Sequence, residues 1–193
     1  MQFKRLNFKV KMIDNQNHFE KIYREFHLLV FNVALNYLQN TEDAEEVTQD
    51  VFVKIYNSLN NFNQKSSYKT WIYRITINQC LDFLKQKNSQ KRFFIFGKKS
   101  QNEQEYLNTS TFEHPGILLE NQEDAALLFA VFNTLTENQK TAFLLSKLDG
   151  LSNPEIAEIM QLSISSVESL IFRAKASLQQ KLAEKFNHYR KKK

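Results

Sequence analysis

The stretch TENQKTAFLLSKLDGLSNPEIAEIMQLSISSVESLIFRAKASLQQKL, residues 136–182, carries the signals that decide the fold. Capping boxes at 136–139 (T-x-x-Q) and 152–155 (S-x-x-E) each start a helix, and Asp-Gly at 149–150 ends the first of them. A turn at 161–163 separates the second helix from a longer one. The inward face of that longer helix carries Ile164, Val167, Ile171, Ala174, Leu178 and Leu182. A short helix, a turn and a longer helix predict a helix-turn-helix, the unit with which many regulators read DNA.

The outer face of the longer helix is polar. The stripe opposite the core would face the major groove of DNA, and it consists of Ser165, Ser166, Ser169 and Arg173. Lys175 lies close to this stripe, where it could bind a phosphate. Glu168 lies on the same helix, and its carboxylate is unfavourable near phosphates unless it caps its own helix. An ordinary helical hairpin with a polar outer face is the alternative to DNA binding.

The composition favours an all-helical protein. Only 3 Gly and 2 Pro occur among 193 residues, too few for the frequent turns of a sandwich, a barrel or a doubly wound sheet. A hydrophobic content of 42% with 17 Phe provides a core, whereas a mean hydropathy of −0.50 and short apolar runs exclude a membrane span. Residues 1–12 lack the apolar segment of a signal peptide and Cys80 is the single cysteine, so we expect a cytoplasmic protein.

No pattern of catalytic residues stands out. Cys80 has no neighbouring His in the sequence, a glycine-rich phosphate loop is missing, and the 4 His are scattered. We therefore expect no enzyme activity, no cofactor and no metal site. One acidic group could in principle hold a metal, but stabilisation of a helix start and docking of a protein are favoured for it: Asp43, Glu45, Glu46 and Asp50.

The first part of the chain predicts three helices. Apolar residues recur at helical spacing over 19–38, a second helix follows Thr41 and ends near Asn60, and a third covers about 70–87. The third helix and the loop before it combine polar and aromatic side chains, namely Phe62, Tyr68, Trp71, Tyr73, Arg74, Asn78, Asp82 and Lys85. Cations interleaved with rings suit single-stranded nucleic acid, because cations follow the backbone and rings stack on bases. Trp71 and Tyr73 cannot face the same surface, so at least one of them is expected in the core.

Charge changes sign along the chain. Residues 71–99 carry 7 basic residues and 1 acidic one, whereas residues 100–124 carry 6 acidic and no basic residues. Helical periodicity also fails over 88–121. The pattern predicts an acidic linker between two helical lobes that bind polyanions, although a solvated charge run is the plainer alternative. The apolar cluster at 93–96 must be buried against some surface.

Three motifs in this order resemble those of extracytoplasmic-function (ECF) RNA polymerase sigma factors of the sigma-70 family. They are DAEEVTQDVFVK at 43–54, TWIYRITIN at 70–78 and the helix-turn-helix segment at 150–175. The resemblance implies an all-α protein of two helical domains joined by a flexible acidic linker. The implied parts are a three-to-four-helix bundle called sigma region 2 (15–92), the linker (93–122), sigma region 4 (123–185) and a basic tail (186–193). The N-terminal extension (1–14) matches no part of the family, and we expect it to be disordered.

The resemblance also implies a function without catalysis. Region 2 would dock on the β′ clamp helices of core RNA polymerase and melt the minus-10 promoter element, and region 4 would contact the β flap and read the minus-35 element. The acidic linker would thread polymerase channels, and an anti-sigma factor would be the inhibitor.

Site residues follow from the same motifs. The implied polymerase-binding residues are Asp43, Glu46, Gln49, Asp50 and Phe52. The implied minus-10 residues are Phe62, Ser66, Ser67, Tyr68, Trp71, Arg74, Asn78, Asp82 and Lys85, with a pocket for a flipped base at the 61–69 loop. The implied minus-35 residues are Ser165, Ser166, Ser169, Arg173 and Lys175. Basic residues are common in the family where this chain has Glu168 and Leu170.

Two other classes of protein fit parts of the pattern. A stand-alone helix-turn-helix regulator would bind duplex DNA as a dimer, and tight specific binding without polymerase would reveal it. A helical adaptor that binds only protein would keep every activity after Ser169→Glu and Arg173→Ala. A sigma factor would instead bind duplex DNA weakly on its own, because its two DNA-reading lobes gain from being held together by polymerase.

Overall fold

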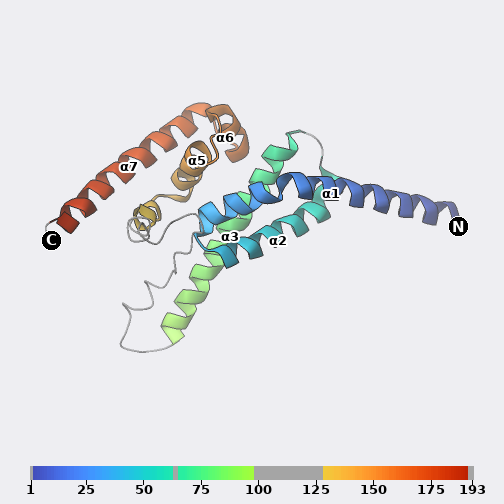
Figure 1. Ribbon diagram of the computed structural model, residues 1–193, viewed down its shortest axis with the longest axis horizontal. Helices are drawn as coiled ribbons and strands as arrows, with labels where there is room; N and C mark the ends of the chain where they lie inside the picture. The colour runs from blue at the N-terminus through green and yellow to red at the C-terminus, as the bar shows by residue number, and fades with distance from the viewer. Residues whose placement is uncertain (1, 63–64, 98–127, 191–193) are drawn as a thin grey trace. The chain divides into compact units, whose positions relative to one another are not determined.

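A computed structural model describes residues 2–62, 65–97 and 128–190 of the chain, with side chains over 16–62, 65–89 and 128–184 (Figure 1). Every regular element in those ranges is a helix, which confirms the all-α prediction. The elements are α1 (Gln2–Leu38), α2 (Thr41–Ser58), the 3₁₀ turn η1 (Leu59–Asn61), α3 (Tyr68–Gly97), a helical stretch at 128–132, α5 (Glu137–Lys147), α6 (Asn153–Met160) and α7 (Ile164–Arg190).

The chain divides into two compact units. The first, lobe one, comprises Met1–Leu38 and Glu42–Lys87, and the second, lobe two, comprises Gln39–Thr41 and Asn88–Lys193. The domain boundaries inferred from the motifs, 15–92 and 123–185, stay predictions. The same holds for the acidic linker, since 98–127 lie outside the described residues.

Lobe one is held together by the apolar faces of α1, α2 and α3. The side chains that are fully enclosed include Val30, Val33, Val47, Val51, Ile55, Ile72 and Cys80. Thr76 is also fully buried, and its hydroxyl donates to the Ile72 carbonyl at 2.8 Å, so its polar atom is satisfied within the helix. Cys80 is a free cysteine and packs as a small apolar side chain in this core.

Lobe two forms the expected helix-turn-helix. Leu145 of α5, Ile156 of α6 and Val167 of α7 are fully buried and bring the three helices together. Gln161 ends α6 in the left-handed conformation with φ 57°, and the Leu162 N–H donates to the Ala157 carbonyl at 3.0 Å. The left-handed Gln161 and this bond close the turn between α6 and α7 at the residues predicted for it.

Three local signals in lobe two are confirmed. Thr136 and Gln139 form a reciprocal capping box at the start of α5, and Ser152 pairs with Glu155 at the start of α6. After α5, Gly150 has φ +65°, the left-handed conformation that L side chains adopt only with strain.

Several boundaries differ from the expectation. Helix α1 begins at Gln2, so residues 2–14 of the extension are helical, contrary to the expected disorder. Helix α3 begins at Tyr68 and continues to Gly97, so the apolar cluster at 93–96 lies in a helix, although its side chains lie outside the described residues. Ile164 was expected inward but is 46% exposed, because it opens α7 before the helix reaches the buried position of Val167.

The Thr136 cap should contribute measurably to lobe two. The Thr136 Oγ1 accepts from the Gln139 N–H at 3.4 Å, and the Thr136 N–H donates to Gln139 Oε1 at 3.1 Å. We expect Thr136→Ala to lower the free energy of unfolding by about 1 kcal/mol, because it leaves a helix-terminal donor without its cap. Chemical denaturation followed by circular dichroism measures this change. Thr136→Ser keeps the oxygen and should resemble the parent, and equal stability of the Ala and Ser variants would contradict the prediction.

Candidate functional site

The start of α2 presents an acidic face to solvent, which consists of Asp43, Glu46, Gln49 and Asp50. Glu42 and Asp43 lie in the first turn, where their negative charge is stabilised by the helix dipole. Glu46, Gln49 and Asp50 are exposed. Helix α3 engages both ends of this face: Lys87 forms an ion pair with Asp43, and Gln79 Nε2 donates to Asp50 Oδ2 at 2.8 Å. The acidic face is thus exposed in its middle and attached to α3 at its ends.

Phe52 lies beneath this surface and not on it. It is only 5% exposed, and its ring contacts Phe19 at 6.3 Å and Tyr23 at 4.7 Å between centroids, both in edge-to-face geometry. Little of the ring is available to a partner. The structure therefore places Phe52 in the core, where it supports α2 against α1.

Aromatic rings cluster where the 59–67 loop meets the start of α3. Phe62 stacks on Tyr68 with centroids 4.4 Å apart and tilts against Trp71 at 4.8 Å, and His18 of α1 meets Tyr68 edge-on at 5.5 Å. All three rings of Phe62, Tyr68 and Trp71 are partly exposed. Residues 63–64 of the loop lie outside the described part. The rings expected at the minus-10 element are thus brought together.

Ser67 orders the entry into α3. Its Oγ accepts from the Thr70 N–H at 3.1 Å, and its carbonyl accepts from the Trp71 N–H at 3.1 Å. Ser67 therefore caps the helix and directs Trp71 into the cluster. Ser66 is half-buried beside it.

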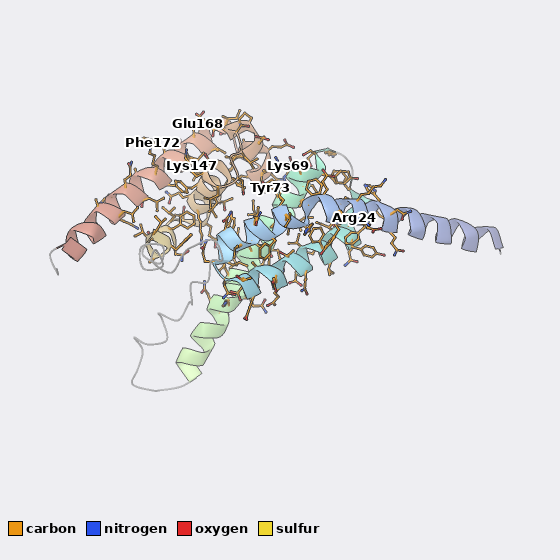
Figure 2. The ribbon with its side chains drawn as sticks, in the orientation of Figure 1. Arg24, Lys69, Tyr73, Lys147, Glu168 and Phe172 are labelled. Atoms are coloured by element: carbon orange, nitrogen blue, oxygen red, sulfur yellow. The ribbon has the colours of Figure 1, made fainter. Side chains whose placement is uncertain are left out.

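Most residues expected to form the polar stripe on α3 are exposed to solvent. Asn78, Asp82 and Lys85 are exposed on one side of the helix. Arg74 is half-buried and makes contacts within the protein. Tyr73, labelled in Figure 2, is 3% exposed and is the core member of the Trp71 and Tyr73 pair. Trp71 is only half-buried.

Helix α7 carries the outer face of the helix-turn-helix. Ser165, Ser169, Arg173 and Lys175 are exposed as expected. Ser166 is exposed too, but its hydroxyl lies 2.7 Å from that of Ser163, and the Ser166 N–H donates to Ser163 Oγ at 3.2 Å. Ser163 is therefore the cap of α7, and Ser166 shares its hydroxyl with that cap.

The sequence reasoning missed Phe172. Its ring is 74% exposed, the most exposed large hydrophobic side chain among the described residues (Figure 2). Position 172 follows Ser165 by seven residues and Ser169 by three, so it belongs to the same helical face. Continuing the stripe from Ser165 and Ser169 at helical spacing would have predicted that Phe172 is exposed.

Glu168 is bonded inside the helix-turn-helix. Asn153 Nδ2 at the start of α6 donates to Glu168 Oε1 at 3.4 Å. This contact joins the two helices of the motif and uses part of the carboxylate's capacity to accept hydrogen bonds. Its partner is Asn153, whereas the cap of its own helix is supplied by Ser163.

Other site types find no support in the described ranges. No group of three or more His, Cys, Asp or Glu there could hold a metal ion. Within the same ranges no helix is long and apolar enough to cross a bilayer. Lobe two has the helix-turn-helix fold common to DNA-binding proteins, and lobe one carries an exposed acidic face on α2.

Comparison with known proteins assigns this architecture to a family. The family model for sigma-70 region 2 matches residues 22–90, and that for sigma-70 region 4 matches residues 126–178. The ECF RNA polymerase sigma-E factor of Haemophilus influenzae is 31% identical over 141 residues, which cover 72% of this chain and 75% of the relative. The sigma-E factor of Escherichia coli K12 is 30% identical over 141 residues, which cover 72% of this chain and 74% of that protein.

The chain belongs to the ECF family of RNA polymerase sigma factors. It is therefore a sigma factor that directs transcription initiation, and the stand-alone regulator and the adaptor are set aside.

Solved structures share the fold. The structure of CnrH in complex with the cytosolic domain of CnrY superposes with a TM-score of 0.61 at 21% identity, covering 88% of this chain and 90% of that one. The sigma factor RpoE of Bartonella quintana, solved with the anti-sigma factor NepR, gives a TM-score of 0.64 at 21% identity, covering 86% of this chain and 97% of that one.

Proposed function

We propose that the exposed surfaces of the two lobes divide the work of a sigma factor. The acidic face of α2 docks on core polymerase, the aromatic cluster with the α3 stripe holds the opened minus-10 strand, and the outer face of α7 contacts the minus-35 element. The observation that carries this proposal is the cluster of three partly exposed rings, Phe62, Tyr68 and Trp71, at the head of the helix with the exposed polar stripe.

Stacking and cations account for strand binding in this proposal. A base that leaves the duplex costs a few kcal/mol of lost stacking and pairing, and an aromatic ring returns roughly 1–3 kcal/mol. Lys85 is exposed on the same helix and can follow the phosphates, while Asn78 and Asp82 offer hydrogen-bonding groups to a base edge. Ser66 and Ser67 shape the loop, and Arg74 supports the helix from its half-buried position.

The helix-turn-helix supplies a second, modest reader. Arg173 can donate two hydrogen bonds to a guanine, and Ser165 and Ser169 can bond to a base or a phosphate. Phe172 can contact the methyl group of thymine, and Lys175 can neutralise a phosphate. Each contact is weak on its own, so the proposal predicts that polymerase must hold both lobes on one promoter.

The proposed partners are core polymerase and a protein inhibitor. The acidic face fits a basic surface, for which the β′ clamp helices are our candidate, and the β flap is our candidate for lobe two. The fold is shared with CnrH and RpoE, which were solved with a cytosolic CnrY domain and an anti-sigma factor, so we propose an anti-sigma factor for this chain as well. We further propose that the protein acts in the cytoplasm and has no catalysis of its own.

Run-off transcription from a genomic fragment library tests the function directly. Purified core polymerase is supplied with and without the protein, and a second sigma factor verifies that the polymerase is active. We expect new start sites that appear only with this protein and share two spaced sequence elements. If no such transcripts arise from an active polymerase and a complete library, the assignment of promoter-directing activity fails.

A further inference from the structure

Gln79 bridges two side chains of α2 from its place on α3. Its Nε2 donates to Asp50 Oδ2 at 2.8 Å, and its Oε1 accepts a hydrogen bond from the Lys54 ammonium. Gln79 is half-buried between the helices, whereas Asp50 and Lys54 are exposed. One neutral side chain therefore separates a carboxylate from an ammonium group on the neighbouring helix.

The two charges determine how the Gln79 amide is oriented. An ammonium group has only donors and a carboxylate has only acceptors, so the amide oxygen must face Lys54 and the NH₂ group must face Asp50. A carboxylate at position 79 would repel Asp50, and an apolar side chain would bond to neither group. The amide is thus the side-chain chemistry that suits both neighbours at once.

Without this bridge the two α2 residues would meet each other. Asp50 and Lys54 are four residues apart with the acid first, which is the favourable order for an ion pair along a helix. The described structure shows no such pair between them, and Lys54 instead bonds to Gln79. Gln79 therefore bonds to the Lys54 ammonium group in place of Asp50. Of the two Asp50 carboxylate oxygens, it is Oδ2 that accepts from Gln79.

We propose that Gln79 is a positioning residue for polymerase docking, which holds Asp50 in an outward, unneutralised state by occupying Lys54. The inference rests on the proposed docking role of Asp50. It assigns to α3 a part in polymerase binding, in addition to its part at the DNA strand. The binding free energy at the acidic face would then depend on a residue that does not touch polymerase itself.

The test measures the dissociation constant of the full-length protein for core polymerase by titration of a fluorescent label. Gln79→Met should weaken binding by up to about twofold, because Asp50 then forms an exposed ion pair with Lys54 that is worth roughly 0.2–0.5 kcal/mol and competes with polymerase. Adding Lys54→Met to this variant should restore most of the affinity, because Asp50 loses its competing partner. Gln86→Met removes an exposed amide from the same helix and should change nothing.

Comparison with Asp50→Asn distinguishes failure of the positioning role of Gln79 from failure of the docking role of Asp50. If Asp50→Asn leaves the affinity unchanged, the docking role of Asp50 fails. If Asp50→Asn weakens binding but Gln79→Met does not, docking stands and the positioning role is overturned. A loss in Gln79→Met that Lys54→Met does not rescue, together with a lower melting temperature, shows a structural role and overturns the inference as well.

Discussion

The double variant Ser169→Glu/Arg173→Ala is expected to lose nearly all transcription that depends on a minus-35 element. Arg173 is exposed on the outer face of α7, and removing one good bidentate contact to a base costs about 1–3 kcal/mol, or roughly five- to 150-fold. A carboxylate at position 169 adds repulsion from phosphates on the same face. Run-off transcription at a polymerase concentration that does not saturate the promoter measures the loss, and we expect about one to two orders of magnitude on the basis of these terms.

Paired promoters make the test specific to the minus-35 contact. Each protein is compared on a promoter that retains its minus-35 element and on one in which that element is scrambled. The parent should distinguish the two promoters, and the double variant should not. Gln179→Glu adds the same charge to an exposed position nearly three turns further along α7 and should behave as the parent. A double variant that still distinguishes the promoters would refute the reading role of this face.

Local signals explain why lobe two could be predicted from its sequence. The caps at Thr136 and Ser152 and the left-handed Gly150 depend on residues within one helical turn of each other, so a sequence motif contains all that determines them. Once the first residue of α7 is known, the helical repeat of 3.6 residues per turn determines which of its side chains face solvent. Phe172 was missed because the stripe was limited to polar residues, although the period placed it there.

Contacts between helices limited the prediction in lobe one. Sequence spacing placed Asp43 and Asp50 on one face of α2, but it could not show that Lys87 and Gln79 of α3 bond to them, since those partners are 44 and 29 residues away. The resemblance implied that Phe52 faces polymerase, yet packing against Phe19 and Tyr23 of α1 buries it. Likewise only the packing of α3 decides that Tyr73 is buried and Trp71 is partly exposed.

Loss of the ring at Phe62 should impair promoter opening severely. Phe62 stacks on Tyr68 and contacts Trp71, so it lies in the centre of the partly exposed cluster. Phe62→Leu keeps an apolar side chain of similar size but removes the flat face on which a base can stack. We expect the rate of open-complex formation to fall about five- to 150-fold, which corresponds to one lost stacking contact of roughly 1–3 kcal/mol. Fluorescence of a base analogue in the minus-10 element measures this rate.

A template with a mismatched bubble across the minus-10 element shows whether strand opening is the affected step. The mismatches already supply the few kcal/mol needed to unpair the bases, so Phe62→Leu should regain most of its activity on this template. Phe62→Tyr retains the ring and should resemble the parent on both templates. A Leu variant that stays equally impaired on the bubble, or a Tyr variant as impaired as Leu, would show that Phe62 supports the fold or docking instead. Because an unfolded or undocked protein cannot be rescued by an opened template, rescue would tie the aromatic cluster to the separated strand.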